Sequence, residues 1–344
     1  MRLEPVARLP GKRVLTWDGR SLYASERYRV VRSDTLSDPS EWKDVAEFRP
    51  RLSRRLASSN RFTARLLRSG FHVLRVLGSG RLVGIVDGAV VVAGPSDTEF
   101  RVTFTVLRGT RPLTLAVGRD DHLYWGEYFA NPHRDEVHIY GSRDRGDTWD
   151  IVHTFPKDHV KHVHTVTWDP FAECFWVLTG DYEQECKILR ADQDWSVVET
   201  VMSGDQQTRA ATCLPSPDGL YFATDTPLAQ NHIYLLDRSG RLEKGRPLAG
   251  SSLQSCRVDG GFFFSTAVEP STFNRSGRCT VVGSADGVEW ADLLEWRKDR
   301  LPAGLFQFGN IFLPTGNNET SLLAATGMAV RREDFVSHIW RVHS

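Results

Sequence analysis

The sequence predicts an all-β fold, a seven-bladed β-propeller closed by pairing of its N- and C-terminal strands. Three observations support this prediction. A hairpin-turn pattern recurs about every 49 residues along the 344-residue chain, helical periodicity is almost absent, and the two ends of the chain complement each other as strands. Because repeats of 40–50 residues are typical of propeller blades, we expect residues 1–344 to form a single β-propeller domain.

The clearest turn lies in HIYGSRDRGDTWDIVHTF, residues 138–155. Its flanks are rich in β-branched and aromatic residues, which favours two strands joined by a hairpin turn. Asp144 and Ser142 can bond backbone N–H groups within the turn, and Gly146 supplies a position of positive φ. Trp149 then begins the second strand with a large apolar side chain.

Degraded forms of this turn recur before and after it. They follow the strands near 33, 93, 191, 237 and 284, and a large side chain occupies the tryptophan place at 42, 100, 149, 195, 242 and 290. The next marker would fall near 338, where the chain ends after three strands of a blade. Residues 2–11 resemble an outer strand, so they complete the last blade beside residues 338–343, as expected for a closed propeller.

Residues 49–70 are the exception to the repeat. This arginine-rich segment has helical character and lengthens the first repeat, so we expect a basic insertion between blades 1 and 2. A solvated basic patch is the preferred interpretation of its charge over a binding site.

The composition excludes some classes of protein. Lys plus Arg and Asp plus Glu both total 43, which argues against a general nucleic-acid binder. No apolar run approaches the length of a membrane span, and the first residues lack the apolar core of a signal peptide. With five widely spaced cysteines, we expect reduced thiols and a cytoplasmic protein.

Functional groups gather in the loops at one face of the predicted propeller. The turns between the first and second strands of each blade (a–b) are short, whereas the loops between the second and third strands (b–c) are long and polar. The loops that lead from one blade to the next (d–a) reach the same face as the b–c loops. Because propellers place sites where loops converge on a rigid ring, we expect the site at this b–c face.

The loop after residue 124 offers the first candidates. Trp125 and Tyr128 can stack on the apolar face of a sugar, and Glu127, at the end of a strand, can act as an acid or base. Solvated loop charges are the alternative.

His162 and His164 are the second candidates, because two residues apart on a strand their side chains point to the same face. We expect a catalytic or substrate-binding pair. A metal site, with Asp181 as a further ligand, is the alternative that we do not favour, so no cofactor is predicted. Buried structural histidines are a further alternative.

Asp181, Arg209 and Asp225 form the third group, brought to the same face from neighbouring blades. An arginine among carboxylates can hold the carboxylate of an acidic sugar in a bidentate contact. Ion pairs that tie the loops together explain the same residues equally well.

The pattern Ser142-x-Asp144-x-Gly146-x-Thr148-Trp149 resembles the Asp-box, or BNR repeat, of sialidase-like β-propellers. Residues 113–240 resemble BNR-repeat proteins often labelled glycosyl-hydrolase-like. Sialidases use an arginine triad on six blades, and no such triad can be placed in this sequence. Seven-bladed polysaccharide lyases are a nearer analogue. They use histidine and tyrosine beside a neutralised uronate, residue types that His162, His164, Tyr128 and Arg209 supply.

The predicted function is therefore a carbohydrate-active propeller, a lyase or glycoside hydrolase acting on an acidic oligosaccharide or polysaccharide. In the lyase version a histidine or Tyr128 takes a proton while Arg209 holds the acid group. In the hydrolase version Glu127 pairs with Asp181 or Asp225. The alternative is a non-catalytic propeller that binds a glycan or a protein through the same loops.

Overall fold

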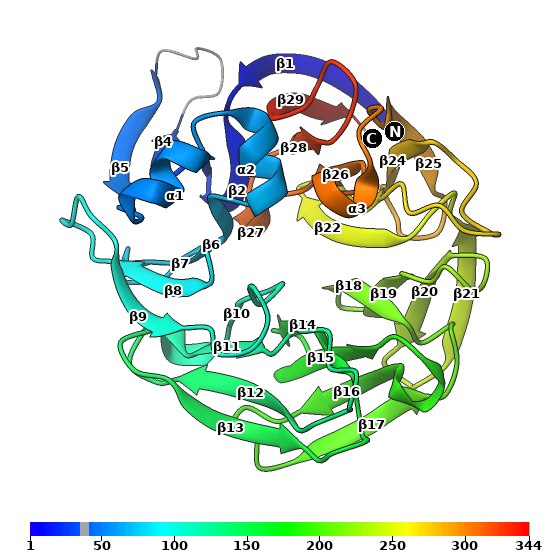
Figure 1. Cartoon of the computed structure of the whole chain (residues 1–344). Helices are drawn as coiled ribbons and strands as arrows, with labels where there is room; N and C mark the ends of the chain where they lie inside the picture. Colours follow the sequence, from blue (N-terminus) through cyan, green and yellow to red (C-terminus); the bar gives the residue numbers. More distant parts are fainter. Residues whose placement is uncertain (35–40, 344) are drawn as a thin grey trace.

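A computed structural model describes residues 1–34 and 41–343, and it has the expected architecture. Seven antiparallel sheets of four strands each stand around a common centre, with one extra strand added to the first. Figure 1 shows the closed ring of sheets with the two termini side by side. The all-β, seven-bladed propeller predicted from the repeat is confirmed.

Each blade follows the chain from its innermost to its outermost strand. The strands of blades 1 to 3 are β2 (Arg13–Gly19), β3 (Ser21–Glu26), β4 (Arg29–Ser33) and β5 (Lys43–Glu47); β6 (Phe71–Val76), β7 (Leu82–Val86), β8 (Ala89–Ala93) and β9 (Arg101–Thr105); and β10 (Ala116–Val117), β11 (Leu123–Gly126), β12 (Val137–Ser142) and β13 (Asp150–Phe155).

The strands of blades 4 to 6 are β14 (His162–Asp169), β15 (Cys174–Gly180), β16 (Lys187–Ala191) and β17 (Val198–Ser203); β18 (Ala210–Pro215), β19 (Gly219–Thr224), β20 (His232–Asp237) and β21 (Leu242–Pro247); and β22 (Ser252–Val258), β23 (Gly261–Thr266), β24 (Arg278–Ser284) and β25 (Ala291–Arg297). Blade 7 contains β26 (Asn310–Phe312), β28 (Leu322–Met328), β29 (Val336–His343) and β1 (Arg2–Pro10).

The last blade is closed by both ends of the chain. β1 pairs antiparallel with β29 from Arg2↔His343 to Pro10↔Val336, so the predicted closure is confirmed. The sequence did not predict β27 (Thr315–Asn318), which pairs in parallel with β2 and links blades 1 and 7 a second time.

The turn between β12 and β13 is held by its own side chains. The Ser142 hydroxyl accepts a hydrogen bond from the Gly146 N–H at 2.7 Å and donates to Asp144 Oδ1 at 2.8 Å. Asp144 also accepts from the backbone and hydroxyl of Thr148. Ser284 and Asp286 repeat the arrangement in blade 6. The turn expected at 33–42 lies partly outside the described residues.

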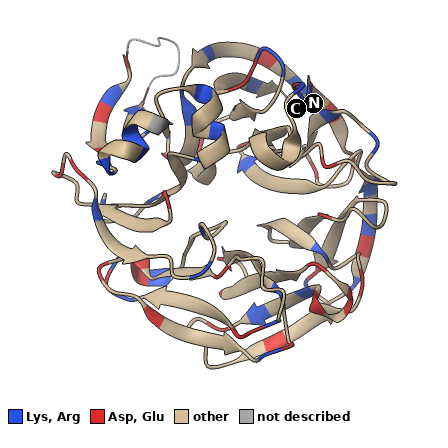
Figure 2. Ribbon diagram, viewed as in Figure 1, with Lys and Arg blue, Asp and Glu red and all other residues tan. Residues whose placement is uncertain are grey.

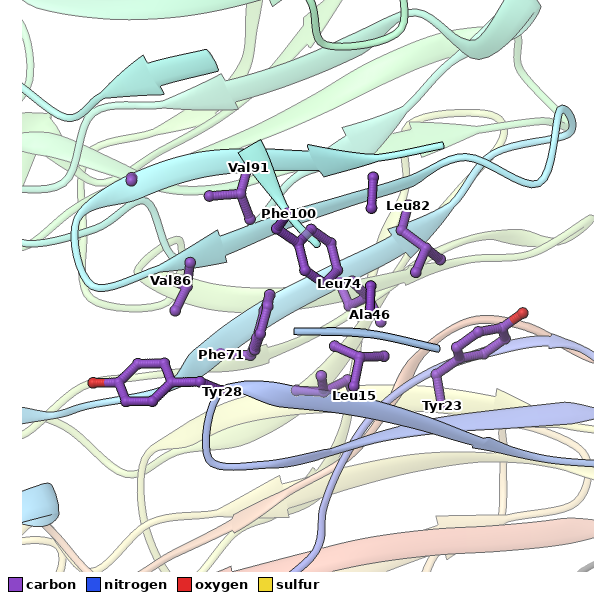
Figure 3. Packing of buried hydrophobic residues seen from close by; sticks show 13 residues of the cluster. Leu15, Tyr23, Tyr28, Ala46, Phe71, Leu74, Leu82, Val86, Val91 and Phe100 are labelled. Carbon is purple, nitrogen blue, oxygen red and sulfur yellow. The ribbon is translucent and has the colours of Figure 1, made fainter. Parts of the chain in front are cut away.

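The core consists of apolar layers between neighbouring blades. Figure 3 shows one of these layers, in which Leu15 and Tyr28 of blade 1 face Phe71 and Phe100 of blade 2. The Phe71 and Phe100 rings lie 5.0 Å apart. Because each sheet buries both faces in this way, the innermost strands are fixed in position around the centre.

Five of the innermost strands have a β-bulge close to their first residues. The register shifts by one residue at Val14/Thr16 in β2, Phe71/Val73 in β6, Val163/Thr165 in β14, Ala210/Thr212 in β18 and Ser252/Gln254 in β22. A bulge leaves one residue unpaired and re-aims its side chain. The unpaired residues include His72 and His164, at the end of the strands that meets the b–c face.

The 49–70 insertion forms two short helices, α1 (Leu52–Ala57) and α2 (Arg61–Leu67), which cover part of the b–c face beside α3 (Ala303–Phe306) (Figure 1). Blue segments in Figure 2 mark their arginines. Arg65 departs from the solvated patch that we expected. It is 1% exposed and pairs with Asp299 at 2.5 Å and Asp334 at 3.3 Å, which ties the insertion to the loops around blade 7.

Two further findings concern the described residues only. Their five cysteines are all buried and free. None of their helices is long and apolar enough to cross a membrane.

Deletion of residues 1–10 is expected to lower the melting temperature sharply, because β29 would lose its partner and become an open sheet edge. Circular dichroism melts measure this. Replacement of the solvent-facing Arg2 and Glu4 by alanine keeps the backbone pairing and serves as the control. An unchanged melting curve for the deletion would contradict the closure.

Asp144→Ala is expected to lower the melting temperature at pH 7. Burial alone would raise the pKa of Asp144, but hydrogen bonds from Thr148, Ser142 and Asp147 lower it from 3.8 to about 2. The stabilisation is thus complete above about pH 4 and is lost as the pH falls through about 2. The difference in melting temperature between the wild type and Asp144→Ala should narrow as the pH falls through this range. Asp150→Ala, which removes a neighbouring carboxylate outside the turn bonds, is the control. A difference in melting temperature that does not change with pH would refute the role of the ionised Asp144 carboxylate in the turn.

Candidate functional site

His162 and His164 meet at the b–c end of β14. Their side chains are 3–4% exposed, and the two Nε2 atoms lie 2.9 Å apart. The bulge between Val163 and Thr165 turns His164 toward His162. Each Nδ1 faces a backbone carbonyl at 2.9 Å, that of Phe129 for His162 and that of Ala210 for His164.

Asp181 follows β15 and completes the group. Its Oδ1 lies 3.2 Å from His164 Nε2 and 3.5 Å from His162 Nε2. Lys161 Nζ contacts Oδ2 at 2.7 Å and Arg209 contacts Oδ1 at 3.3 Å. We call these five residues the histidine cluster. They come from blade 4 and the start of blade 5, so the fold joins two of the predicted groups.

The charges around Asp181 keep it ionised. Burial works to raise the pKa of this carboxyl, but the contacts with the two histidines and the charge of Arg209 lower it far below its usual range. Burial is also the largest influence on His162, where it lowers the pKa and favours the neutral imidazole.

Tyr128 packs directly on this cluster. Its ring centroid lies 4.4 Å from that of His162 and 6.0 Å from that of His164. Burial raises the pKa of Tyr128, the charges of Asp181 and Asp225 add to this, and Arg111 and Arg209 oppose it.

Asp225, at the end of β19, is a buried carboxyl beside Arg209. Its Oδ1 is buried without a hydrogen-bond partner, and so is Nε of Arg209. Burial raises the pKa of Asp225 from 3.8 to about 7, against the opposing charge of Arg209. A carboxyl that titrates near neutral pH is suited to proton transfer.

Two predicted residues lie outside this group. Trp125 is 1% exposed and stacks on Tyr140, with ring centroids 4.4 Å apart, inside the layer between blades 2 and 3. An indole covered in this way offers no surface to a sugar. Glu127 is 2% exposed and is held by the Arg108 guanidinium and by the His138 N–H at 2.9 Å. Its carboxylate faces the loop interior, where its contacts stabilise the chain.

Arg13, His72 and Arg111 form a second group that sequence reasoning missed, here called the arginine cluster. His72 Nδ1 lies 3.1 Å from Nη1 of Arg111 and 3.5 Å from Nη1 of Arg13. These residues stand at or before the start of the innermost strands of blades 1 to 3, the same level at which His162 begins β14. The signal in the sequence that could have identified them is their position in the repeat, at or just before the first strand of a blade.

The arginine cluster has no acidic partner among residues 1–34 and 41–343. Burial, with a smaller effect of neighbouring arginines, lowers the pKa of Arg13 to about 9 and that of Arg111 to about 10. Burial likewise lowers the pKa of His72, helped by Arg111 and Arg13. The Arg13 guanidinium stacks 4.0 Å from the Phe312 ring, and its Nε has no hydrogen-bond partner.

Tyr128 is subject to the charges of both clusters, because Asp181 raises its pKa and Arg111 lowers it. A cavity of about 180 Å³ also reaches Arg13 from beneath α2, lined in addition by Tyr28 and Phe71. The combined site can bind an anion at one end and transfer protons at the other. The atoms that could hold a metal ion are Nε2 of His162, Nε2 of His164 and a carboxylate oxygen of Asp181.

The fold resembles solved propellers at low sequence identity. A chain of the mitotic checkpoint complex (TM-score 0.60, 10% identity) aligns with 99% of this chain and 95% of its own, and the WD40 propeller of Doa1 (0.60, 12%) with 99% and 97%. The GH74 enzyme of Niastella koreensis (0.54, 13%) aligns with 85% of this chain and 47% of its own. No family model and no curated protein sequence matches the chain. These similarities establish the propeller fold.

Asp225→Asn is expected to raise the melting temperature at pH 8 more than at pH 4. The folded chain keeps the Asp225 proton up to a pKa of about 7, whereas the unfolded chain loses it near 3.9. Wild-type stability therefore falls as the pH rises through this window, and asparagine removes that loss. Asp218→Asn, in an a–b turn at the opposite face, is the control. A pH-independent difference would contradict the raised pKa.

Proposed function

We propose that this chain is a carbohydrate-active propeller that binds an acidic oligosaccharide at the centre of the b–c face and cleaves it by β-elimination. The observation that carries the proposal is the excess of positive charge beside a group of proton-transfer residues. Arg13 and Arg111 are partly buried beside His72 and have no carboxylate partner among the described residues, and the charge of Arg111 acts on Tyr128, whose ring packs on His162.

An anionic ligand would relieve the main electrostatic penalty of this site. Guanidinium groups withdrawn from water are unfavourable unless an opposite charge compensates them, and planar guanidinium groups match carboxylates well. Arg209, which is 8% exposed, already contacts Asp181. The arginine cluster is therefore a better place than Arg209 for the acid group of a uronate.

The proton-transfer groups suit β-elimination. A base removes the proton at C5 of the uronate, the C4–O bond breaks as the C4=C5 double bond forms, and the leaving oxygen takes up a proton. The candidate base is a histidine of the pair or Tyr128. Asp225, with a pKa raised to about 7, is the candidate to donate or relay the second proton.

The hydrolase version has less support. It needs two carboxyl groups on either side of a glycosidic bond, and Glu127 is engaged with Arg108 and the backbone of His138. Asp181 and Asp225 remain as a pair, but Asp181 is occupied by Lys161 and Arg209.

The turn geometry supports a place among Asp-box propellers. In both well-formed turns the serine and aspartate side chains hold the turn backbone, and a tryptophan follows. The fold neighbours include a GH74 enzyme and the WD40 domain of Doa1. Because both kinds share this architecture, the choice between catalysis and binding depends on the site.

Incubation with uronate-containing and neutral oligosaccharides tests the proposal. We expect ultraviolet absorbance from unsaturated uronate products with the acidic substrates only. His164→Ala should lower this rate at least about a hundredfold, the scale of a lost general acid or base. Arg111→Gln should weaken substrate binding at least about tenfold, because a charge-assisted contact is lost. His122→Ala, in an a–b turn at the opposite face, is the control.

Other outcomes would redirect the proposal. New reducing ends without ultraviolet absorbance would replace elimination by hydrolysis. Binding without turnover would make the chain a glycan-binding propeller. Binding that does not respond to Arg111→Gln would contradict the proposed position of the acid group.

A further inference from the structure

The tautomers of His162 and His164 leave no hydrogen for a bond between the two rings. Both Nδ1 atoms lie 2.9 Å from backbone carbonyl oxygens. A carbonyl can only accept, so each Nδ1 must carry the hydrogen. In a neutral imidazole the other nitrogen is then a bare acceptor.

Three acceptors therefore face one another. The Nε2 atoms of His162 and His164 lie 2.9 Å apart, and Oδ1 of Asp181 lies 3.5 and 3.2 Å from them. With neutral imidazoles no hydrogen is available between any two of these atoms. Such an arrangement is unfavourable unless a cation or an added proton lies among them.

The spacing of the three atoms matches a metal ion. The circle through them has a radius of about 1.9 Å, so a point slightly to either side of their plane lies about 2.1 Å from all three atoms. Zinc binds imidazole nitrogen and carboxylate oxygen at about 2.0–2.2 Å. Metal-binding histidines usually donate their other N–H to a carbonyl or carboxylate, which fixes the tautomer. Both histidines do so here.

We infer that Nε2 of His162, Nε2 of His164 and Oδ1 of Asp181 bind a divalent transition-metal ion. Lys161, which contacts the other carboxylate oxygen at 2.7 Å, orients Asp181 as an outer-shell partner. Two imidazoles and one carboxylate suit Zn²⁺, Fe²⁺ or Ni²⁺ better than Mg²⁺, which prefers oxygen ligands. Three protein ligands leave positions open for water or substrate, as in catalytic sites.

This inference stands on the tautomers and distances, independently of the proposed activity. If the metal site and the proposed elimination are both correct, the two histidines are metal ligands, and the base of the elimination is Tyr128, whose ring packs on His162. The charge of the ion adds to those of Lys161 and Arg209, and this excess again favours an acidic ligand. A shared proton in place of the metal is the competing explanation.

Metal binding is measured on the full chain without a histidine tag and without substrate. After chelator treatment and dialysis, titration calorimetry with Zn²⁺ should give one site per chain, and Mg²⁺ at the same concentration should give none. His162→Ala and Asp181→Asn should each weaken Zn²⁺ at least about tenfold. His122→Ala, on the opposite face, removes a histidine without touching the site and should bind Zn²⁺ as the wild type does.

The spectrum of the Co²⁺-loaded protein identifies the ligands. We expect visible bands of a nitrogen- and oxygen-bound ion without the near-ultraviolet absorption of a cysteine thiolate ligand. If His162→Ala does not fold, Asp181→Asn keeps the shape of the side chain and decides the result. Stoichiometric Zn²⁺ binding that survives both substitutions, a thiolate spectrum, or no Zn²⁺ binding at millimolar concentration would each overturn the inference.

Discussion

The antiparallel pairing of β1 with β29 is the constraint on which the functional site depends. It joins residues more than 300 positions apart along the sequence and, together with the pairing of β27 with β2, closes the row of sheets into a ring. Ring closure leaves each blade packed between two neighbours. The innermost strands then cannot move apart, and the polar side chains at their ends keep fixed distances across blades.

That rigidity explains how unfavourable groups can be held together. The arginine cluster gathers two guanidinium groups and an imidazole from blades 1, 2 and 3, and the histidine cluster sets three acceptor atoms against one another. Neither arrangement would persist on flexible loops, because repulsion would separate the groups. A bulge near the start of the innermost strand aims His72 and His164 inward. β-Bulges are common beside binding and catalytic sites, where they re-aim a side chain.

The sequence predicted the features that depend on local patterns. The turn at 142–149, the repeat spacing and the outer-strand character of residues 2–11 are each visible within short segments, and the ring follows from their repetition. The sequence predicted that His162 and His164 share a face because side chains two apart on a strand do so; in the structure the bulge between Val163 and Thr165 brings His164 to His162.

The misplaced and missed residues depend on register and on long-range contacts. Trp125 and Glu127 lie where a strand ends, and only the pairing with β12 decides that they turn into the protein. Arg13, His72 and Arg111 are separated by about 40 to 60 residues, and nothing local distinguishes a buried arginine from a solvated one. Arg65, expected in a solvated patch, shows the same limit.

The most direct measurement is a crystal structure of the His164→Ala variant grown with a uronate oligosaccharide, which this variant does not cleave. The account predicts ligand density at the centre of the b–c face, with an acid group within hydrogen-bond distance of Arg111 or Arg13 and a sugar ring beside Tyr128. Ligand density on the opposite face, or an acid group bound by surface residues of the outer strands, would contradict it.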